Sequence, residues 1–554
     1  MTDAARLVID AIVRSWAVPG CSVAAIRPDG SRFTHRVGHS DLDRRVPVAP
    51  GQLFQIGSIS KAFNATVLLQ LAEQGVIGLD TAVGEILDWL PDSLRANGIT
   101  IRRLLNHTAG LISGIEALPD DVGQVALCDA ALSGARPGTY FHYSNLGYLL
   151  LGLVATEVSG RPLARLVEEQ ILVPLGMRDS VAAVTNDRYD SLARGYQPRY
   201  DDRPWLPGEP LTLAPWFEVA GADGNLASTA DDLCRFAAML LGRGASNDSM
   251  VLGPNEFDAM ITSVAPGGED VLELPGVAAT DSSHYGLGIN VEGQNGRTVL
   301  THGGGMVGYA SFLLADLDAG LAVCVVTNAN GDTPVAEAIA RCVATELTAP
   351  GSVRVQRLDP RWWDAADIER RGLAGGFRSA GPATEPRRSI EVSVTERDGP
   401  LVRLSVSDSI DSAPLLRTWG PRAVTSLPAL RRYALAPDRG RWFWGADEFA
   451  PSGADTPDPA TPPELSAYCG HYRCYSPWFT NFRVVLRGDR LMLIAPGGVE
   501  APGVDTELVP LGPNIFRIGA DERVPERVIF GPPIHGAAPW ADRDGCRYSR
   551  AFTD

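Results

Sequence analysis

The sequence has almost no lysine: of its 49 basic residues, only Lys61 is a lysine and the rest are arginine. It also lacks excess positive charge, since 66 acidic residues give a net charge of −17. This charge disfavours nucleic acids and anionic membranes as partners, because their phosphates would be repelled. No apolar run reaches the ~20 residues that a bilayer span requires. Near the start, Arg6, Asp10 and Arg14 alternate with apolar residues, which predicts a helix and not a signal peptide.

Cysteine pairs with metal-binding or redox spacing are also absent. The eight cysteines are scattered without any Cys-x-x-Cys pair, and this pattern is typical of buried thiols in a reducing compartment. His35 and His39 lie in a predicted strand and turn, where four-residue spacing does not converge on a metal ion. We therefore expect a soluble, cytoplasmic protein with no metal and no organic cofactor.

The position of the single lysine is the first feature that points to chemistry. Arginine can carry surface charge as well as lysine can, but it cannot lose its proton at useful pH. Lys61 is therefore a candidate for a titratable amine; the alternative is one lysine that survived a coding bias. Ser58 lies three residues earlier, at the start of a predicted amphipathic helix over 60–75. Residues at this spacing share a helix face, so the hydroxyl and the amine can meet.

A serine at a helix start also lies near unpaired backbone N–H groups and the positive end of the helix dipole, which favour developing negative charge. An activated nucleophile needs these components: a hydroxyl, an adjacent base and a place for the oxyanion. Ser-x-x-Lys alone is a weak pattern that a simple helix cap also explains. Ser60 is a second serine in the segment, but the three-residue spacing from Lys61 selects Ser58.

Two later segments complete a set of motifs. Tyr143 and Asn145 follow a Pro-Gly turn and precede a helical stretch over 146–159. His302 opens a glycine-rich strand entry, where glycines allow a substrate backbone to approach closely. Together the three ordered motifs resemble those of the serine β-lactamase and penicillin-binding-protein superfamily, in its class C-like branch: Ser58-x-x-Lys61, Tyr143-x-Asn145 and His302-x-Gly304. The similarity covers about residues 1–347.

The resemblance implies a role for each of these residues. Ser58 is expected to be the nucleophile and to form an acyl-enzyme, with Lys61 and Tyr143 sharing the base role; which of them accepts the serine proton stays open. Asn145 is expected to orient Lys61 and to donate to the substrate amide. Substrate binding and the oxyanion site are expected to involve the third motif and two backbone N–H groups: His302, Gly304, Gly305 and Ser58.

Two departures from common β-lactamase motifs bear on function. The tyrosine at 143 is typical of class C enzymes, and His302 replaces a frequent lysine. Because histidine is largely neutral near pH 7, it is a poor partner for a substrate carboxylate. We therefore expect a serine hydrolase of small peptides, amides or esters, including D-residue-specific peptidases and aminopeptidases. A penicillin-binding-type thioesterase or transacylase (peptide cyclase) is the alternative, followed by a β-lactamase or DD-carboxypeptidase. A catalytically idle binding protein is disfavoured, because it would not need the lysine.

The expected fold is α+β, with an antiparallel sheet flanked by helices over residues 1–347. Strands are predicted at 21–26, 31–37, 310–314 and 321–327, and helices at 229–242 and 334–348 as well. Beyond residue 360, short alternating segments predict two small antiparallel barrels, at 360–446 and 464–554, which resemble the lipocalin-like domains of D-aminopeptidase-type family members. The Pro-rich stretch 447–463 is predicted to be a linker. The barrels are expected to be separable from the chemistry, and the oligomeric state is open.

Overall fold

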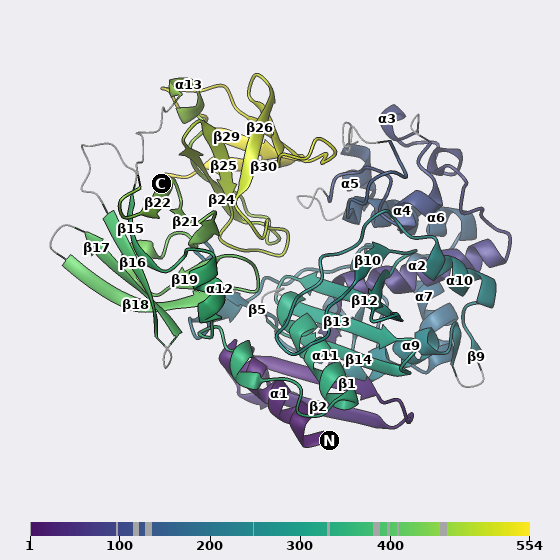
Figure 1. The fold of residues 1–554 in the computed structure, drawn as a ribbon. Helices are drawn as coiled ribbons and strands as arrows, with labels where there is room; N and C mark the ends of the chain where they lie inside the picture. Colours follow the sequence, from purple (N-terminus) through teal and green to yellow (C-terminus); the bar gives the residue numbers. More distant parts are fainter. Residues whose placement is uncertain are drawn as a thin grey trace. The chain divides into compact units, whose positions relative to one another are not determined.

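The computed structural model forms two compact units (Figure 1). Unit 1 comprises Met1–Gln197, Leu211–Arg354 and Glu522–Glu526, and unit 2 comprises Pro198–Pro210, Val355–Asp521 and Arg527–Asp554. The structure describes residues 2–95, 98–114, 121–127, 136–246, 249–329, 333–379, 388–395, 399–406, 409–454 and 462–553. Within these ranges no helix is long and apolar enough to span a bilayer.

Unit 1 is built on an eight-stranded antiparallel sheet. Its strands run in the order β10-β11-β12-β13-β14-β1-β2-β3. The N-terminal strand β1 pairs with β14, so that Val23 lies opposite Val325. The strand bounds are Ser282–Tyr285, Asn290–Gln294, Arg297–Met306, Tyr309–Asp316, Leu321–Thr327, Gly20–Ile26, Arg32–Asp41 and Val46–Pro47, in sheet order.

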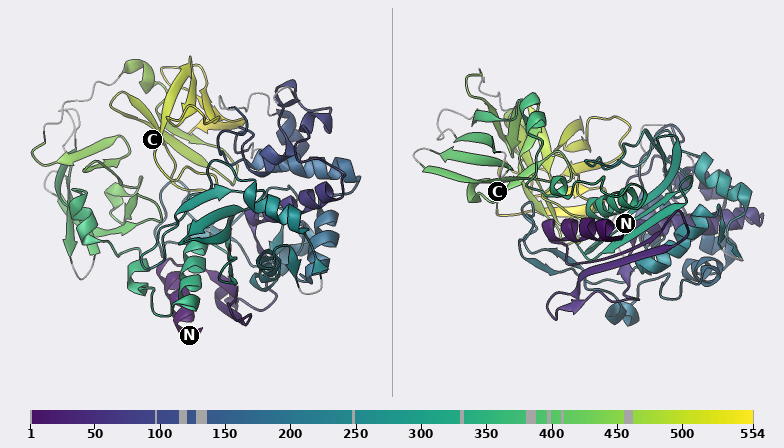
Figure 2. Two further views of the ribbon diagram at one scale, coloured as in Figure 1. Left: turned by 45° about the vertical axis from the view of Figure 1, so that its right-hand side comes forward. Right: turned by 60° about the horizontal axis from the view of Figure 1, so that its bottom comes forward.

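Helices cover this sheet on both faces (Figure 2). Strands β1, β13 and β14 are buried at every position, which is the pattern of strands with no solvent-facing side. Helix α11 (Thr333–Thr348) packs on β13 and β14 together with α1 (Thr2–Ser15), whereas α9 (Ala230–Leu241) packs on β14 and β1. The predicted α+β class and its flanking helices are thus confirmed.

Helix α2 (Ser60–Glu73) differs from its prediction. We expected an amphipathic helix, but its first twelve residues, from Ser60 to Leu71, are all buried. A helix that is surrounded on all sides by protein needs no polar face. Phe63 stacks on Phe236 of α9 at 3.8 Å between ring centroids, and α6 (Asn145–Ser159) packs on another side. The helix that carries Lys61 is therefore a rigid central element of unit 1.

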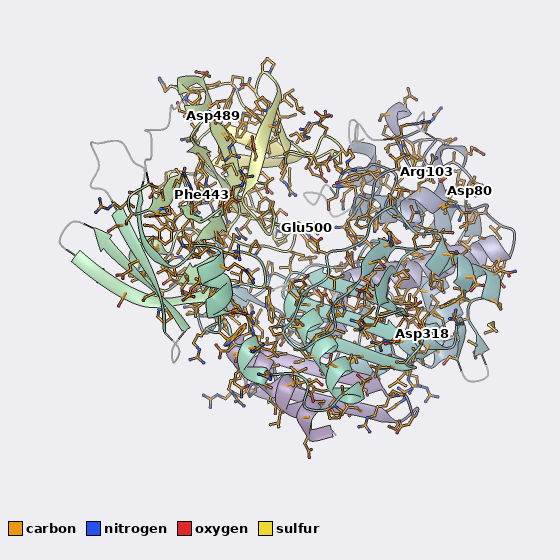
Figure 3. All side chains as sticks on the ribbon, in the orientation of Figure 1. Asp80, Arg103, Asp318, Phe443, Asp489 and Glu500 are labelled. Atoms are coloured by element: carbon orange, nitrogen blue, oxygen red, sulfur yellow. The ribbon has the colours of Figure 1, made fainter. Side chains whose placement is uncertain are left out.

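The β13–β14 hairpin shows how local sequence fixes the sheet next to β12. Asp318, labelled in Figure 3, accepts a 2.7 Å hydrogen bond from the backbone N–H of Thr298. Gly320 takes a φ of 64°, a left-handed conformation that suits the glycine of this Asp-Ala-Gly turn. The turn ties the start of β12 to the hairpin and so positions the strand that carries His302.

Shorter elements complete unit 1. Its other helices are α3 (Asp92–Arg95), α4 (Ile101–Leu105), α5 (Asp121–Leu127), α7 (Leu163–Val167), α8 (Val173–Leu175) and α10 (Pro254–Thr262). Two-stranded sheets pair β4 (Phe54–Gln55) with β7 (Ala227–Ser228), and β8 (Ala245–Ser246) with β9 (Ser249–Met250). Strands β5 (Tyr196–Pro198) and β6 (Leu211–Leu213) form a third pair.

Unit 2 contains two antiparallel β-structures, as the alternating segments predicted. The first is an eight-stranded sheet in the order β19-β18-β17-β16-β15-β22-β21-β20. Its two ends meet where Ala423 and Leu435 exchange backbone hydrogen bonds of 2.8 and 2.7 Å. The bounds of β15 to β22 are Gly375–Ser379, Arg388–Thr395, Gly399–Val406, Ser409–Arg417, Ala423–Thr425, Ala436–Asp438, Arg441–Trp444 and Asp447–Pro451, and α12 (Ala365–Arg370) precedes them.

The second β-structure is a closed eight-stranded barrel, in which β23 pairs with β30. Helix α13 (Pro463–Ser466) precedes it. Aromatic side chains dominate its core, with Tyr472 and Phe482 both fully buried. The bounds of β23 to β30 are Gly470–Arg473, Asn481–Arg487, Arg490–Ile494, Thr506–Gly512, Ile515–Ile518, Arg527–Phe530, Trp540–Arg543 and Cys546–Arg550.

The prediction that residues 447–463 form a linker is wrong for the first five of them. These residues form β22, which pairs with β15 and β21. Phe449 is fully buried opposite Trp442, so burial of this ring favours a strand over the extended linker that the neighbouring prolines suggested. Residues 455–461 of the predicted linker lie outside the described residues.

Candidate active site

Ser58 and Lys61 meet at the start of helix α2, as predicted. Ser58 lies in a 3₁₀ turn, Gly57–Ile59, that leads directly into the helix. The Nζ of Lys61 donates hydrogen bonds to Ser58 Oγ at 2.9 Å, Asn145 Oδ1 at 2.8 Å and the backbone oxygen of Asp223 at 2.8 Å. Lys61 is fully buried, whereas Ser58 is only half-buried. Ser58 is therefore partly accessible to solvent, while the Lys61 amine is enclosed by protein.

This geometry suits a lysine that exchanges a proton with the serine. As an ammonium, Lys61 has three protons, and each has an acceptor. As a neutral amine, Lys61 can donate its two protons to Asn145 Oδ1 and to the backbone oxygen of Asp223. Its lone pair is then directed to Ser58 Oγ. The two fixed acceptors thus set the direction in which a base could act. They also bring the first two motifs together, since Asn145 is the first residue of α6.

Tyr143 lies beside the same amine, on a support that His107 provides. The Lys61 Nζ is 4.9 Å from the centroid of the Tyr143 ring. His107 packs against that ring at 4.2 Å, and its Nδ1 accepts a 3.0 Å hydrogen bond from the backbone N–H of Ser144. Burial lowers the pKa of His107 well below its usual range, and the nearby Lys61 charge adds to this. A neutral imidazole here holds the second motif in place.

The third motif lies directly against the 3₁₀ turn of Ser58. A Cβ added to Gly57 would be 2.6 Å from the oxygen of Gly305, and a Cβ added to Gly304 would be 1.9 Å from the oxygen of Ile56. Gly57 also has a φ of +51°, a backbone conformation that favours glycine. The glycines therefore allow the backbones of the turn and of β12 to touch. The first N–H groups of a helix lack intrahelical partners, so the turn provides donors close to Gly305.

His302 is held as a neutral imidazole. Its Nδ1 is 2.7 Å from the oxygen of Gly303, which can only accept, so Nδ1 carries the proton. Its Nε2, 2.7 Å from the hydroxyl of Tyr285, must then accept from Tyr285. Burial lowers the pKa of His302 to about 3, a shift that the Gly303 hydrogen bond opposes and the Lys61 charge reinforces. The third motif therefore offers no cation to a substrate carboxylate.

A carboxylate from far along the sequence supports the second motif within unit 1. His142 Nε2 donates to Glu526 Oε1 at 2.8 Å, and the same oxygen accepts from the backbone N–H of Ser113 at 2.9 Å. Both side chains are largely buried, at 17% and 10% exposure. His142 directly precedes Tyr143, so this hydrogen bond to a carboxylate holds the backbone that positions the tyrosine.

We expect Glu526→Gln to destabilise the protein by about 1–3 kcal/mol at pH 7, since it removes a charge-assisted hydrogen bond from a largely buried site. Although burial acts to raise it, the pKa of Glu526 is held below its usual value by the His142 hydrogen bond and charge and by the Ser113 N–H. A lowered pKa stabilises the folded state above the unfolded value of about 4.3, and this contribution disappears as pH falls through the folded value. Urea unfolding should show that the free energies of unfolding of wild type and Glu526→Gln differ at pH 7 and converge at acid pH.

The control for this prediction is Glu522→Gln, which removes an exposed carboxylate from the same segment. It should leave the stability of the protein within about 0.5 kcal/mol of wild type, as surface substitutions usually do. An equal loss in both variants, or a Glu526→Gln deficit that is constant down to acid pH, would contradict the role of the Glu526 carboxylate.

Three contributors to this site were missed by the sequence analysis. Asp223 belongs to none of the three motifs, and it contributes its backbone oxygen. Tyr285 lies on β10, whose pairing through β11 to β12 is invisible in a motif search. Glu526 is 384 residues from its partner His142. In the part of the chain that the structure describes, no group of three or more His, Cys, Asp or Glu side chains gathers in a way that could hold a metal ion.

Known proteins resemble this chain in sequence and fold. The family model named Beta-lactamase matches residues 7–345. Penicillin-binding protein 4* of Bacillus subtilis is 25% identical over 326 residues, which are 55% of this chain and 67% of that protein. An unguisins hydrolase of Aspergillus campestris is 30% identical over 336 residues, which are 57% of this chain and 59% of that protein.

A solved structure extends the similarity in fold beyond the matched region. The octameric penicillin-binding protein homologue from Pyrococcus abyssi superimposes with a TM-score of 0.56 at 20% identity, covering 89% of this chain and 98% of that one. At this identity the match concerns the fold alone. The family match spans more than half of the chain and contains all three motifs. The chain therefore belongs to the β-lactamase family, whose members are serine hydrolases.

Proposed function

We propose that this serine hydrolase cleaves amides or esters of small peptides through a covalent ester on Ser58. The observation that carries the proposal is the 2.9 Å hydrogen bond between Lys61 Nζ and Ser58 Oγ, made by a buried amine that two further acceptors hold in place. The free thiols among the described cysteines support a reducing, cytoplasmic setting. The unguisins hydrolase supports hydrolysis as the reaction type.

In the proposed mechanism, Ser58 Oγ attacks the substrate carbonyl and its proton passes to Lys61. The oxyanion is placed between the backbone N–H groups of Ser58 and Gly305, which the close approach of the two backbones supports. Tyr143, beside the amine, gives its hydroxyl proton to the departing amine or alcohol and takes up the proton that Lys61 holds, so that the C–N or C–O bond breaks and the acyl ester remains. Water then attacks the ester by the reverse proton path and releases the acid.

The substrate class follows from the neutral third motif. β-Lactams and C-terminal D-alanine peptides present a carboxylate, and a neutral His302 provides no opposite charge for it. This favours amide and ester substrates that lack a free carboxylate beside the scissile bond over the β-lactamase and DD-carboxypeptidase alternatives. The configuration of the acyl residue, D or L, is an outcome of the experiment below.

The test uses mass spectrometry of the intact protein and of its products. The wild-type protein is incubated with D- and L-phenylalanine p-nitroanilide, with peptide thioesters and with a penicillin. We expect a transient acyl mass on the Ser58 peptide and release of the linear acid. A cyclic or aminolysed product would assign the chain to the transacylases instead, and rapid turnover of penicillin would overturn the substrate class.

A further inference from the structure

The strand pair that closes the barrel of unit 2 brings two cysteines onto one face. Strands β23 and β30 are antiparallel neighbours, and Arg473 of β23 lies opposite Ser549 of β30. Continued by one residue, this register places Cys474 opposite Tyr548, and Cys546 lies two residues from Tyr548 on the same face of β30. The side chains of Cys546 and Tyr548 are buried in the barrel core, and Cys474 is partly buried against that core.

The loop that follows β23 holds the Cys474 sulfur in place. The backbone N–H of Cys474 donates to the oxygen of Thr480 at 2.9 Å, which closes the loop. Within the loop, the backbone N–H of Ser476 donates to Cys474 Sγ at 3.4 Å. As a thiol, Cys474 can donate to the oxygen of Phe479 at 3.3 Å, and the Tyr548 hydroxyl donates to the same oxygen at 2.9 Å. The shared oxygen therefore places the Tyr548 hydroxyl beside the sulfur.

These contacts favour a thiolate at Cys474. A hydrogen bond from Cys546 lowers the pKa of Cys474 to about 7, against the effect of burial, and the Ser476 N–H and the Tyr548 hydroxyl add to the shift. Cys474 is also partly exposed, and its neighbour Tyr475 is fully exposed. Oxidation by a peroxide requires a thiolate that the reagent can reach. Cys474 meets both conditions.

Cys469 provides the natural comparison within the same barrel. It is partly exposed as well, and it also packs against the barrel core. Burial raises its pKa to about 11, and its Sγ lies 4.0 Å from the oxygen of Leu465, an acceptor that favours the protonated thiol. The remaining described cysteines are all buried: Cys21, Cys234, Cys324, Cys342 and Cys546. Among the described cysteines, Cys474 is therefore the one that combines exposure with a lowered pKa.

We propose that Cys474 and Cys546 form a redox-sensitive pair that hydroperoxides convert to a disulfide. The Cys474 thiolate attacks hydrogen peroxide, the O–O bond breaks with loss of hydroxide, and the sulfur becomes a sulfenic acid. The Cys546 thiol then loses its proton and attacks that sulfur, the S–S bond forms, and the sulfenic oxygen leaves as water. In sum the two thiols are oxidised and the peroxide is reduced to two water molecules. The new bond would join the two strands that close the barrel.

The test treats the full-length protein with hydrogen peroxide at pH 7, followed by digestion without reduction. Peptide mass spectrometry should find the peptides of Cys474 and Cys546 joined, with the loss of two hydrogen atoms, and dithiothreitol should separate them. Before oxidation, limiting iodoacetamide should modify Cys474 roughly 10- to 100-fold faster than Cys469, because the larger thiolate fraction outweighs the lower nucleophilicity of a less basic sulfur.

Cys469→Ser is the matched control and should still form the disulfide. Cys546→Ser should stop at a sulfenic acid on Cys474, which dimedone traps; Cys546→Ala is a second replacement of similar size for this buried position. A disulfide that involves Cys469 instead would overturn the inference. So would a sulfenic acid that persists on Cys474 in the wild type, or alkylation of Cys469 as fast as that of Cys474.

Discussion

Ser58→Ala should abolish covalent labelling by a fluorophosphonate probe and reduce amide and ester hydrolysis by about 10⁶-fold, the loss seen when a serine hydrolase loses its nucleophile. The other groups of the proposed site cannot compensate, because Lys61 can only exchange a proton, Asn145 and the backbone oxygen of Asp223 only accept hydrogen bonds from it, and no oxygen is left to attack the carbonyl. The protein should stay folded, since Ser58 is half-buried and its hydroxyl is one of three acceptors of the amine. Peptide mapping of the labelled wild type, with circular dichroism of the variant, measures both effects.

Ser60 provides a matched control for this prediction. It lies two residues away and is fully buried, and its Oγ accepts a 3.0 Å hydrogen bond from the backbone N–H of Leu226. Ser60→Ala should therefore lower stability by about 1–3 kcal/mol, because it leaves a buried donor without a partner, but it should not remove labelling. Labelling at Ser60 or at Ser144 in the wild type would refute Ser58 as the nucleophile.

Local signals in the sequence were strong enough to predict the framework of unit 1. The strand predicted at 321–327 coincides with β14, and helices predicted at 229–242 and 334–348 match α9 and α11 to within a residue at each end. Periodicity could do this because each element repeats one burial pattern over several turns or pairs. The Ser58–Lys61 contact could also be predicted, because three-residue spacing on a helix fixes a distance without any tertiary information.

Contacts between distant segments could not be predicted in the same way. Nothing in the sequence relates Tyr285 to His302, because their contact depends on the register of β10, β11 and β12. The role of Asp223 lies in a backbone oxygen, which every residue has and no motif marks. The extent of β22 was missed for a related reason: Phe449 is buried by pairing with Trp442, while the prolines that follow dominated the local signal.

The His142–Glu526 pair also changes what we expect of the C-terminal region. The sequence predicted that the barrels are separable from the chemistry, because all three motifs precede residue 306. That division stays a prediction. Within unit 1, however, Glu526 holds the residue next to Tyr143, and Ser113 N–H shares the same oxygen. A protein that ends near residue 350 would leave a largely buried His142 without this acceptor, so we expect it to be less stable around the second motif.

Lys61→Arg should be nearly as damaging as Lys61→Ala, with a loss of at least about 10²–10⁴-fold in kcat/KM, the range that general-base catalysis provides. Arginine keeps the positive charge but cannot release a proton. It is also too large for the position, since Lys61 is fully buried and its Nζ is fixed by acceptors from three different segments. Both the proton transfer and the alignment of Ser58 Oγ would be lost. If Lys61 were only a surface cation, its replacement by arginine would change the activity little.

Because the chain contains one lysine, an independent measurement on the unaltered protein is available. Reductive methylation can modify only Lys61 and the N-terminal amine. We expect the N-terminus to react at once and Lys61 to react slowly, because it is buried, and more slowly still once an acyl group on Ser58 lies next to the amine. Mass spectrometry of the N-terminal peptide reports methylation of the terminal amine. The peptide that contains Ser58 and Lys61 reports acylation of the serine and methylation of the lysine separately. If Lys61→Arg were folded and close to fully active, the serine proton would have to pass to Tyr143 alone, and the three hydrogen bonds of Lys61 would then serve only to orient Asn145 and the loop of Asp223.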